Sequence, residues 1–183
     1  MRFLSTQLDG AWLVDLDSHE DDRGYFARTW CQKEFSEHGL NPRLVQTSVS
    51  FNRRRGTLRG MHYQISPHEE AKLVRCARGS IYDVIVDLRS DSSSSLQWQA
   101  FELSENNQRA LYVPEGFAHG FLTLQDNSEI HYQMSEFYHP ESAGGFHWND
   151  PSLAIDWKFP IEIISKNDDN LPLHVPLDTL SAA

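Results

Sequence analysis

Two histidines in glycine-flanked segments are the residues of this chain best suited to chemistry. His62 lies in the segment GTLRGMHYQ, and His119 lies further along in PEGFAHGF. Glycine has no Cβ, so the backbone of such segments can come close to a ligand. An imidazole with a pKa of ~6.5 can take up or release a proton near neutral pH. The pattern favours an acid–base site, although histidines on strands also serve as hydrogen-bonded core residues.

A bound metal is the first alternative, because the two segments resemble the two signatures of the cupin β-barrels. PEGFAH matches the second signature, Pro-x-Gly-x-x-His, but the first, Gly-x5-His-x-His, carries Gln64 in place of its second histidine. The ligands of a metal-dependent cupin would come from His62, Gln64, Glu69 and His119. A neutral amide oxygen is a poor ligand for Fe, Mn or Zn. We therefore expect no metal and no other cofactor in this site.

Charged side chains also interrupt apolar strand-like runs. In AKLVRC, Lys72 shares a face with Val74 and Cys76, and in SIYDVIVDL, Asp83 lies between two isoleucines on one face. A buried charge without a partner is costly. These groups therefore need a partner or a use, and Asp83 with His119 is the obvious structural pair. A binding module without catalysis is the second alternative, in which such hydrogen bonds would account for the polar residues.

Tyrosines complete a possible catalytic set. In IHYQMSEFY, alternation puts Tyr132, Met134, Glu136 and Tyr138 on one side. A phenol with a pKa of ~10 stays protonated at neutral pH and can donate a proton. A cation such as Lys72 can stabilise a developing enolate oxygen. A histidine base, a tyrosine acid and this cation suit removal of a proton next to a carbonyl and its return on the other face, which is epimerisation.

The elements that position these residues are short strands with turn residues between them. Eight runs, rich in Val, Ile, Tyr and Phe, predict an all-β fold, an antiparallel jelly-roll barrel. The runs are Leu44–Phe51, Leu58–Gln64, Lys72–Arg78, Ser80–Leu88, Gln97–Leu103, Ala110–Val113, His119–Leu124 and Ser128–Phe137. One short helix is expected at Gln32–Gly39, with Gly39 as C-cap. Arg59 and His62 can share a pocket only if a bulge occurs at Gly60. From Pro140 onward we expect loops and short turns around the barrel.

Composition limits the class of protein. The 183 residues fit one domain, 1–183, and no apolar stretch approaches the ~20 residues that span a bilayer. The two cysteines form no disulfide framework, and the N-terminus has no apolar signal segment, so a cytoplasmic location is expected. A net charge of −10 argues against a nucleic-acid partner. Arg59 and the neighbouring Arg53–Arg55 are a local cationic cluster, for which a solvated turn is the alternative reading.

Taken together, seven ordered segments resemble the dTDP-4-dehydrorhamnose 3,5-epimerase family of nucleotide-sugar enzymes. They are DRGYFARTW, VQTSVSFNRRRGTLRGMHYQ, EAKLVRCARGSIYDVIVDLR, LYVPEGFAHGF, EIHYQMSEFYHP, WNDPSLAIDW and SKNDDNLP. The resemblance implies a cupin-like barrel, a homodimer, no metal and a dTDP-linked 4-keto-6-deoxyhexose as substrate. An enzyme that inverts only C3 or only C5, or one that acts on a 4-keto sugar carried by another nucleotide, is the alternative within this class.

The resemblance also implies roles for individual residues. His62 would take the protons from C3 and C5, Asp168 would orient it, Tyr132 would be the acid on the opposite face, and Lys72 would stabilise the enolate. Asp169 leaves the identity of the carboxylate partner open. The substrate-binding residues would be Arg23, Phe26, Gln46, Arg59, Asp83, His119 and Tyr138. Of these, Arg23 and Phe26 are expected to reach toward the site of the partner subunit.

Three positions depart from the family pattern. Arg28 stands where a glutamate of the base-recognition region is usual, Ser48 replaces an asparagine that contacts the diphosphate, and Asn167 occupies a place that is usually basic. All three departures affect residues that hold the nucleotide, whereas the expected catalytic residues are present. The resemblance therefore predicts the type of reaction more firmly than it predicts the nucleotide.

Overall fold

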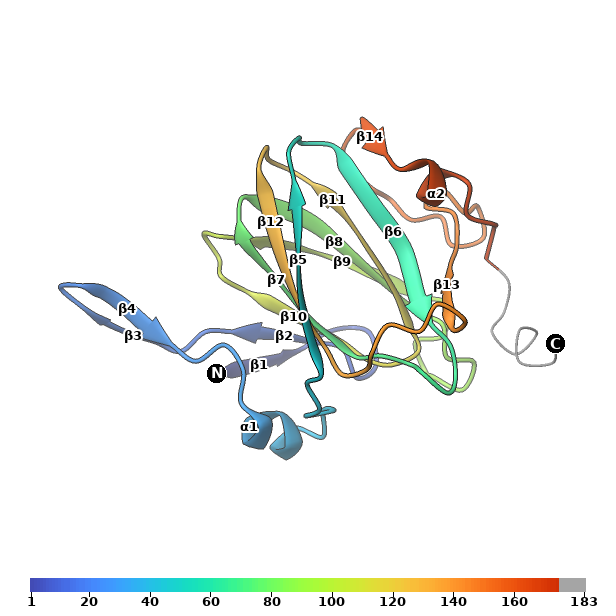
Figure 1. The fold of residues 1–183 in the computed structure, drawn as a ribbon. Helices are drawn as coiled ribbons and strands as arrows, with labels where there is room; N and C mark the ends of the chain where they lie inside the picture. Colours follow the sequence, from blue (N-terminus) through green and yellow to red (C-terminus); the bar gives the residue numbers. More distant parts are fainter. Residues whose placement is uncertain (175–183) are drawn as a thin grey trace.

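Two antiparallel sheets face each other in this computed structural model, which describes residues 1–174 (Figure 1). The end of the expected 1–183 domain lies outside these described residues. One sheet has the order β1-β2-β10-β7-β12-β5, and the other has β13-β6-β11-β8-β9, with β14 pairing with β6 in parallel. The first sheet comprises β1 (Arg2–Ser5), β2 (Trp12–Asp15), β10 (Ala110–Val113), β7 (Lys72–Arg78), β12 (Ser128–Met134) and β5 (Gln46–Asn52). The second comprises β13 (Ala143–Gly145), β6 (Thr57–Gln64), β11 (Phe117–Thr123), β8 (Ser80–Asp87), β9 (Trp98–Ser104) and β14 (Ile163–Ile164).

The predicted all-β jelly roll is confirmed, and each of the eight expected runs forms a strand. Lys72–Arg78 and Ala110–Val113 have the expected bounds, and five others differ by one or two residues at their ends. The eighth, expected to run to Phe137, ends earlier, at Met134, where its pairing with β5 and β7 stops. The N-terminal strands were not predicted. Among them, β3 (Ser18–Asp21) and β4 (Gly24–Ala27) form a two-stranded hairpin that projects from the barrel in Figure 1.

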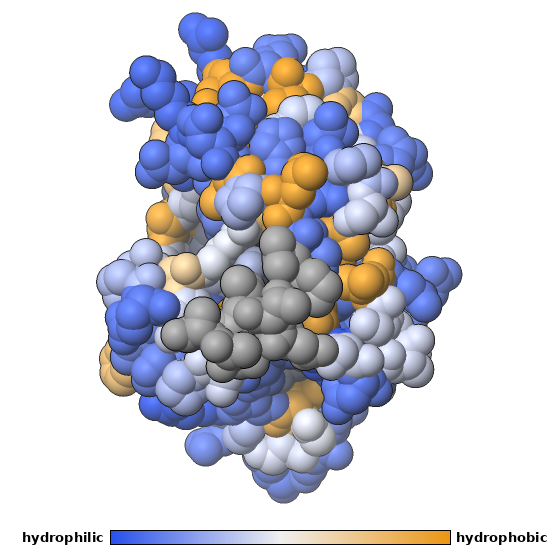
Figure 2. All heavy atoms as spheres, turned by 90° about the vertical axis from the view of Figure 1, so that its right-hand side faces the viewer, coloured by the Kyte–Doolittle hydropathy of each residue, from blue (hydrophilic) through white to orange (hydrophobic). Residues whose placement is uncertain are grey.

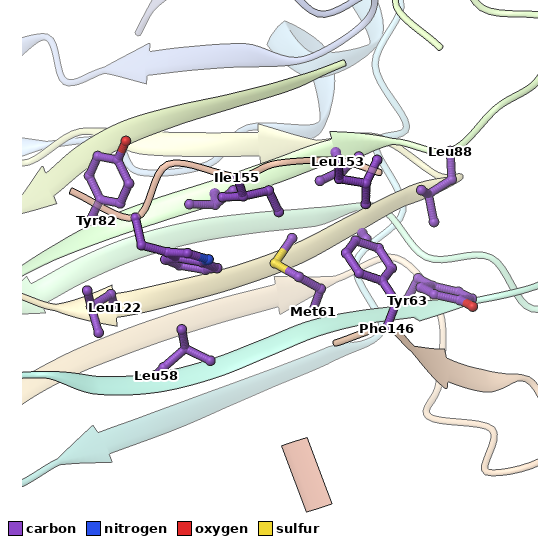
Figure 3. Packing of buried hydrophobic residues seen from close by; sticks show 13 residues of the cluster. Leu58, Met61, Tyr63, Tyr82, Leu88, Leu122, Phe146, Leu153 and Ile155 are labelled. Carbon is purple, nitrogen blue, oxygen red and sulfur yellow. The ribbon is translucent and has the colours of Figure 1, made fainter. Parts of the chain in front are cut away.

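Alternate residues of β8 belong to two different hydrophobic clusters, one on each face of the strand. Ile81 and Ile85 point between the sheets, where they pack with Val74, Cys76 and Phe121. The opposite face of the strand carries Tyr82, Val84 and Val86, and it packs beneath the C-terminal segment. Figure 3 shows this second cluster, in which Met61, Phe146, Leu153 and Ile155 lie between strands and the C-terminal chain. Both faces of the sheet are therefore covered by apolar contacts, which explains why β8 is buried along its whole length.

The expected irregularity at Gly60 is confirmed by the pairing of β6 with β11. His119 pairs with His62, but Phe121 pairs with Arg59, so β6 has one residue more than β11 between these pairs. Gly60 has a φ of 120°, and a Cβ there would lie 2.5 Å from the Cα of Gly120. Only glycine allows this backbone conformation and this close approach. The bulge turns Arg59 and His62 to the same side of the strand despite their odd spacing.

Helices are short and peripheral in the described part of the chain. Helix α1 (Gln32–Glu37) forms where one was expected, but its C-cap is His38 and not Gly39. Gly39 is the next residue, and its φ of 70° is the left-handed conformation that commonly ends a helix. Helix α2 (Lys166–Asp169) was not predicted and lies in the C-terminal segment, which otherwise consists mainly of turns and irregular chain, as expected. Neither helix is long and apolar enough to cross a membrane.

The C-terminal segment covers one side of the barrel. Phe146, Leu153, Ile155 and Trp157 are buried there against the second sheet. On the side that carries α2 and β14, Figure 2 shows mostly hydrophilic residues with smaller hydrophobic groups between them. The segment thus replaces an apolar sheet face with a mainly polar surface, and it also brings α2 close to β6.

Candidate active site

A cavity of about 410 Å³ lies between the two sheets. It is lined by Gln46, Ser48, Ser50, Arg59, His62, Glu70, Lys72, His119, Gly120, Phe121, Tyr132, Met134 and Tyr138. His62 comes from β6 in one sheet, and Tyr132 comes from β12 in the other. The imidazole and the phenol therefore belong to opposite walls of one cavity, which is the arrangement that the sequence predicts.

His62 is held by a carboxylate from a distant part of the chain. Its Nε2 lies 2.8 Å from Oδ1 of Asp168, and the histidine side chain remains 49% exposed on the cavity. The carboxylate accepts a hydrogen from Nε2, which leaves Nδ1 as the nitrogen with a free lone pair. Burial lowers the pKa of His62, and this effect outweighs the opposite influence of Asp168. This shift favours the neutral imidazole, the form that a base needs.

Helix α2 supplies Asp168 and resolves the choice between two neighbouring aspartates. Ser165 caps the helix, and its Oγ accepts a hydrogen bond from the backbone N–H of Asp168. The cap fixes which residue of the turn faces β6. Asp168 is 8% exposed and contacts His62, whereas the carboxylate of Asp169 lies 3.9 Å from His147 on the outer side.

Tyr132 contacts a buried, hydrogen-bonded pair of side chains on the cavity floor, His119 and Asp83. Its ring meets that of His119 edge-on, with centroids 6.0 Å apart. Nε2 of His119 lies 2.9 Å from Asp83, whose side chain is fully buried, so the pair expected from the sequence is present. Burial raises the pKa of Tyr132 well above 10, and the nearby carboxylate of Asp83 adds to this. The phenol thus keeps its proton at physiological pH and can donate it.

Lys72 has a partner that sequence reasoning missed. Its ammonium lies 2.9 Å from Oε1 of Glu70, and both side chains are mostly buried at the cavity wall. No role was expected for Glu70 from the sequence. Glu70, however, has the same parity as Lys72, so the alternation along this segment could have placed both side chains on the cavity side. Lys72 and His62 line the same cavity, and the positive charge of Lys72 also helps to lower the pKa of His62.

Three other expected binding residues also line the cavity. Arg59 donates from Nε to Oδ1 of Asn52, and Gln46 accepts a hydrogen bond from the backbone N–H of Tyr138. Tyr138 is 66% exposed at the cavity wall. The expectation that Glu136 shares this side was wrong. The strand has ended before it, and its carboxylate instead binds Arg43.

Arg23 and Phe26 do not lie in this cavity. Both belong to the projecting hairpin, where Arg23 pairs with Asp21 and Phe26 is 76% exposed. Arg28 follows the hairpin and forms an ion pair with Glu34 of helix α1, at 3.0 Å. Within one chain, therefore, only some of the residues expected to hold the nucleotide lie at the cavity. Gln46 and Arg59 line it, whereas Arg23 and Phe26 do not.

Three of the four residues that would bind the metal in a metal-dependent cupin form hydrogen bonds to other groups of the protein. His62 is paired with Asp168, His119 with Asp83, and the amide of Gln64 with backbone groups. Among residues 1–174, His62, Glu69 and His119 belong to no group of three ligating side chains that are close enough to share one ion. This geometry does not fit the cupin metal site, and the absence of a catalytic metal stays a prediction.

Comparison with known proteins identifies the family of this chain. The family described as dTDP-4-dehydrorhamnose 3,5-epimerase matches residues 5–174. The chain belongs to this family. A relative with that name from Methanothermobacter thermautotrophicus is 45% identical over 174 residues, with 92% of each chain covered. Members of the family are epimerases, so this protein is an isomerase that acts on a nucleotide sugar.

Solved structures agree with the family assignment. The dTDP-4-dehydrorhamnose 3,5-epimerase from Elizabethkingia anophelis superposes with a TM-score of 0.92 at 40% identity, covering 94% of this chain and 96% of that one. A 3′-monoepimerase from Streptomyces bikiniensis, solved in complex with dTDP-quinovose, superposes with a TM-score of 0.86 at 30% identity, covering 96% and 89%. The epimerase fold is thus shared by enzymes that differ in the carbons they invert.

Proposed function

We propose that this protein inverts C3 and C5 of a dTDP-linked 4-keto-6-deoxyhexose by proton removal at one face of the sugar and proton return at the other. The observation that carries the proposal is the placement of a neutral, carboxylate-held His62 and a protonated Tyr132 on opposite walls of one cavity. The cavity volume is in the range of small-ligand sites.

In the first step His62 takes the proton from the carbon next to the C4 carbonyl. The electrons of the broken C–H bond move toward the carbonyl oxygen, which becomes an enolate. Asp168 stabilises the imidazolium that forms, and the ammonium of Lys72 stabilises the negative oxygen. Glu70 orients Lys72 through their ion pair.

In the second step Tyr132 gives its phenolic proton to the opposite face of the same carbon, and the carbonyl reforms. The phenolate that remains is costly in a buried site, but the charge of Arg59 acts to lower the pKa of Tyr132 and eases this cost. The phenolate then regains a proton and His62 loses one, both by exchange with solvent, so the enzyme returns to its starting state. Repetition at the second carbon gives the double inversion.

The nucleotide part of the proposal has separate support. The family is described by its dTDP substrate, and a relative from Bacillus anthracis was solved with TDP bound. Ser48 lines the cavity at the position where the family pattern has asparagine, so a shorter side chain faces the diphosphate there. Gln46, from the same strand as Ser48, and Arg59, from β6 of the other sheet, also line the cavity and would contact the substrate.

We further propose a homodimer as the working form, in the cytoplasm. An isolated two-stranded hairpin is marginally stable in water, and this one exposes Tyr25 and Phe26. Strand β5 lies at the edge of its sheet, with Val49 59% exposed and Phe51 46% exposed. A second subunit would cover both surfaces and would bring Arg23 and Phe26 to a neighbouring cavity. Two free cysteines fit a reducing compartment.

Solvent isotope exchange tests the function directly. We expect that dTDP-4-keto-6-deoxyglucose, incubated with the enzyme in D2O, acquires deuterium at both C3 and C5. Mass spectrometry and proton NMR of the recovered sugar measure it. Exchange at one carbon alone would show that the enzyme inverts only that carbon. The absence of exchange with this substrate and with 4-keto sugars on other nucleotides would contradict the proposal.

The pH dependence of the Asp168→Asn variant tests the role of this carboxylate. Asp168 raises the pKa of His62 against the effect of burial, so its loss lowers that pKa further. Because the base is active when deprotonated, the acid limb of kcat/KM should move to lower pH. The maximal rate should fall by about 10²- to 10⁴-fold, the range for positioned acid–base groups.

The neighbouring Asp169→Asn variant is the matched control. It removes the same charge one residue further along, where the carboxylate faces His147. Both the rate and the position of the acid limb should stay as in the unaltered enzyme. An unchanged limb in Asp168→Asn would show that this carboxylate does not act on the base.

A further inference from the structure

Three side chains that the proposed reaction does not use meet beside the cavity. The imidazoles of His68 and His139 stack face to face, with centroids 3.5 Å apart and planes 5° from parallel. Nδ1 of His139 lies 3.1 Å from Oε1 of Glu141. The three residues each offer a ligating atom, and these atoms all lie within 4.8 Å of one another. Among residues 1–174 no other group of three histidine, cysteine or acidic side chains meets this condition.

A buried amide holds this group together. Nε2 of Gln64 donates to the backbone oxygens of His68, at 2.8 Å, and Phe137, at 3.1 Å. Its Oε1 accepts from the backbone N–H of His139, at 2.7 Å. Gln64 itself is 4% exposed. The two histidines come from segments far apart in the chain, and the three hydrogen bonds of this one side chain hold the backbones of both.

We propose that His68, His139 and Glu141 form a Zn²⁺ site at the rim of the cavity, separate from the catalytic residues and independent of the function proposed above. Imidazole nitrogen suits Zn²⁺, and a carboxylate oxygen is a common additional ligand. Two histidines and one glutamate give three protein ligands and leave a fourth position for water. The net charge of −10 favours the approach of a dication.

A small rearrangement completes the site. The lone pairs of imidazole nitrogens lie in the ring planes, so two parallel rings do not yet point at one ion. One ring would have to rotate about its Cβ–Cγ bond for both nitrogens to point at one ion. Neither ring is enclosed, since His68 is partly exposed and the side chain of His139 is 28% exposed. The side chain of Glu141 is 68% exposed. The carboxylate can therefore follow the ion at little cost.

The ion would connect the two chain segments that border the cavity. One segment carries His68, followed by Glu70 and Lys72 of the cavity wall, and the other carries Tyr138 directly before His139. A hollow of about 450 Å³ next to the cavity is lined by Gln64 and Tyr138 and shares His62 with it. Binding of Zn²⁺ should accordingly restrict the motion of Tyr138 and stabilise the fold.

Metal titration of the untagged protein tests the site. We expect one Zn²⁺ per chain by calorimetry, and Co²⁺ as a probe should give the visible absorption of a nitrogen- and oxygen-bound ion. At about 100 times the Kd, Zn²⁺ should raise the Tm by roughly 5 °C. His139→Gln should weaken binding at least about 10-fold, the lower limit for loss of even an outer-sphere partner. Glu141→Gln should weaken it in the same direction.

His131→Gln is the matched control. His131 also forms a pair with a glutamate, at 2.8 Å from Glu129, but it has no second histidine in a ligating group within the described residues. This variant should bind Zn²⁺ as the unaltered protein does. Lack of stoichiometric binding, or equal binding by the unaltered protein and His139→Gln, would overturn the site. Isotope exchange measured without added metal tests the epimerase separately, so either proposal can fail alone.

Discussion

Replacement of His62 by alanine should abolish solvent exchange at C3 and C5 together. The side chain of His62 is 49% exposed on the cavity, whereas that of the other cavity histidine, His119, is only 5% exposed on the cavity floor. His62 is therefore the cavity histidine that a substrate can reach. We expect the exchange rate at both carbons to fall by about 10⁴-fold, the upper end of the range for a general base. Deuterium content after timed incubation in D2O is the measurement.

The fold should survive this change. The side chain of His62 is half exposed, and its main polar contact is the hydrogen bond to Asp168. Circular dichroism and the Tm should stay close to those of the unaltered protein. His147→Ala is the control, because it removes a histidine from the C-terminal segment outside the cavity and should leave exchange intact. Exchange that persisted at either carbon in His62→Ala would mean that another group is the base.

Replacement of Tyr132 by phenylalanine should separate the two halves of the reaction. The ring and its contact with His119 remain, but the phenolic proton is lost. His62 can still remove and return a proton on its own face, so the substrate should acquire deuterium without inversion. We expect product formation to fall by about 10²- to 10⁴-fold. NMR of the recovered sugar distinguishes labelled substrate from epimerised product.

Tyr82→Phe is the matched control for this variant. Tyr82 lies on the outer face of β8, where its hydroxyl donates to the backbone oxygen of Asp156. The loss of that bond should cost about 1 kcal/mol of stability and leave the reaction unchanged. If Tyr132→Phe slowed label entry into the substrate as much as it slowed epimerisation, the phenol would not be the acid of the second step.

Local features of the chain were enough to predict the barrel and much of its cavity. Alternation along SIYDVIVDL placed Asp83 on the inner face, and the odd spacing of Arg59 and His62 required the bulge that occurs at Gly60. Both inferences follow from strand geometry, in which neighbouring side chains point to opposite faces. The projecting hairpin was missed because its four-residue strands carry little hydrophobic pattern.

The same local rules explain which assignments failed. Glu136 has the parity of Tyr132, yet its strand stops at Met134, and parity has no meaning once pairing ends. Glu70 was given no role, although its ion pair with the mostly buried Lys72 holds it at the cavity. Both glutamates lie just outside a strand, Glu136 after the end of β12 and Glu70 before the start of β7. Their ion pairs therefore depend on where the strand ends or begins, which the sequence pattern does not fix.

By itself, the amino-acid sequence determined eight strands of the barrel, the inner face of β8 and the pair of side chains, His62 and Tyr132, that suits epimerisation. Only the tertiary structure decided which aspartate holds the base, because Asp168 is 106 positions from His62 and reaches it through the docking of α2. It also brought His68 beside His139. The alternation of apolar residues indicates on which face of its own strand a residue lies. Contacts between distant segments depend on how whole elements pack, and no local pattern contains that information.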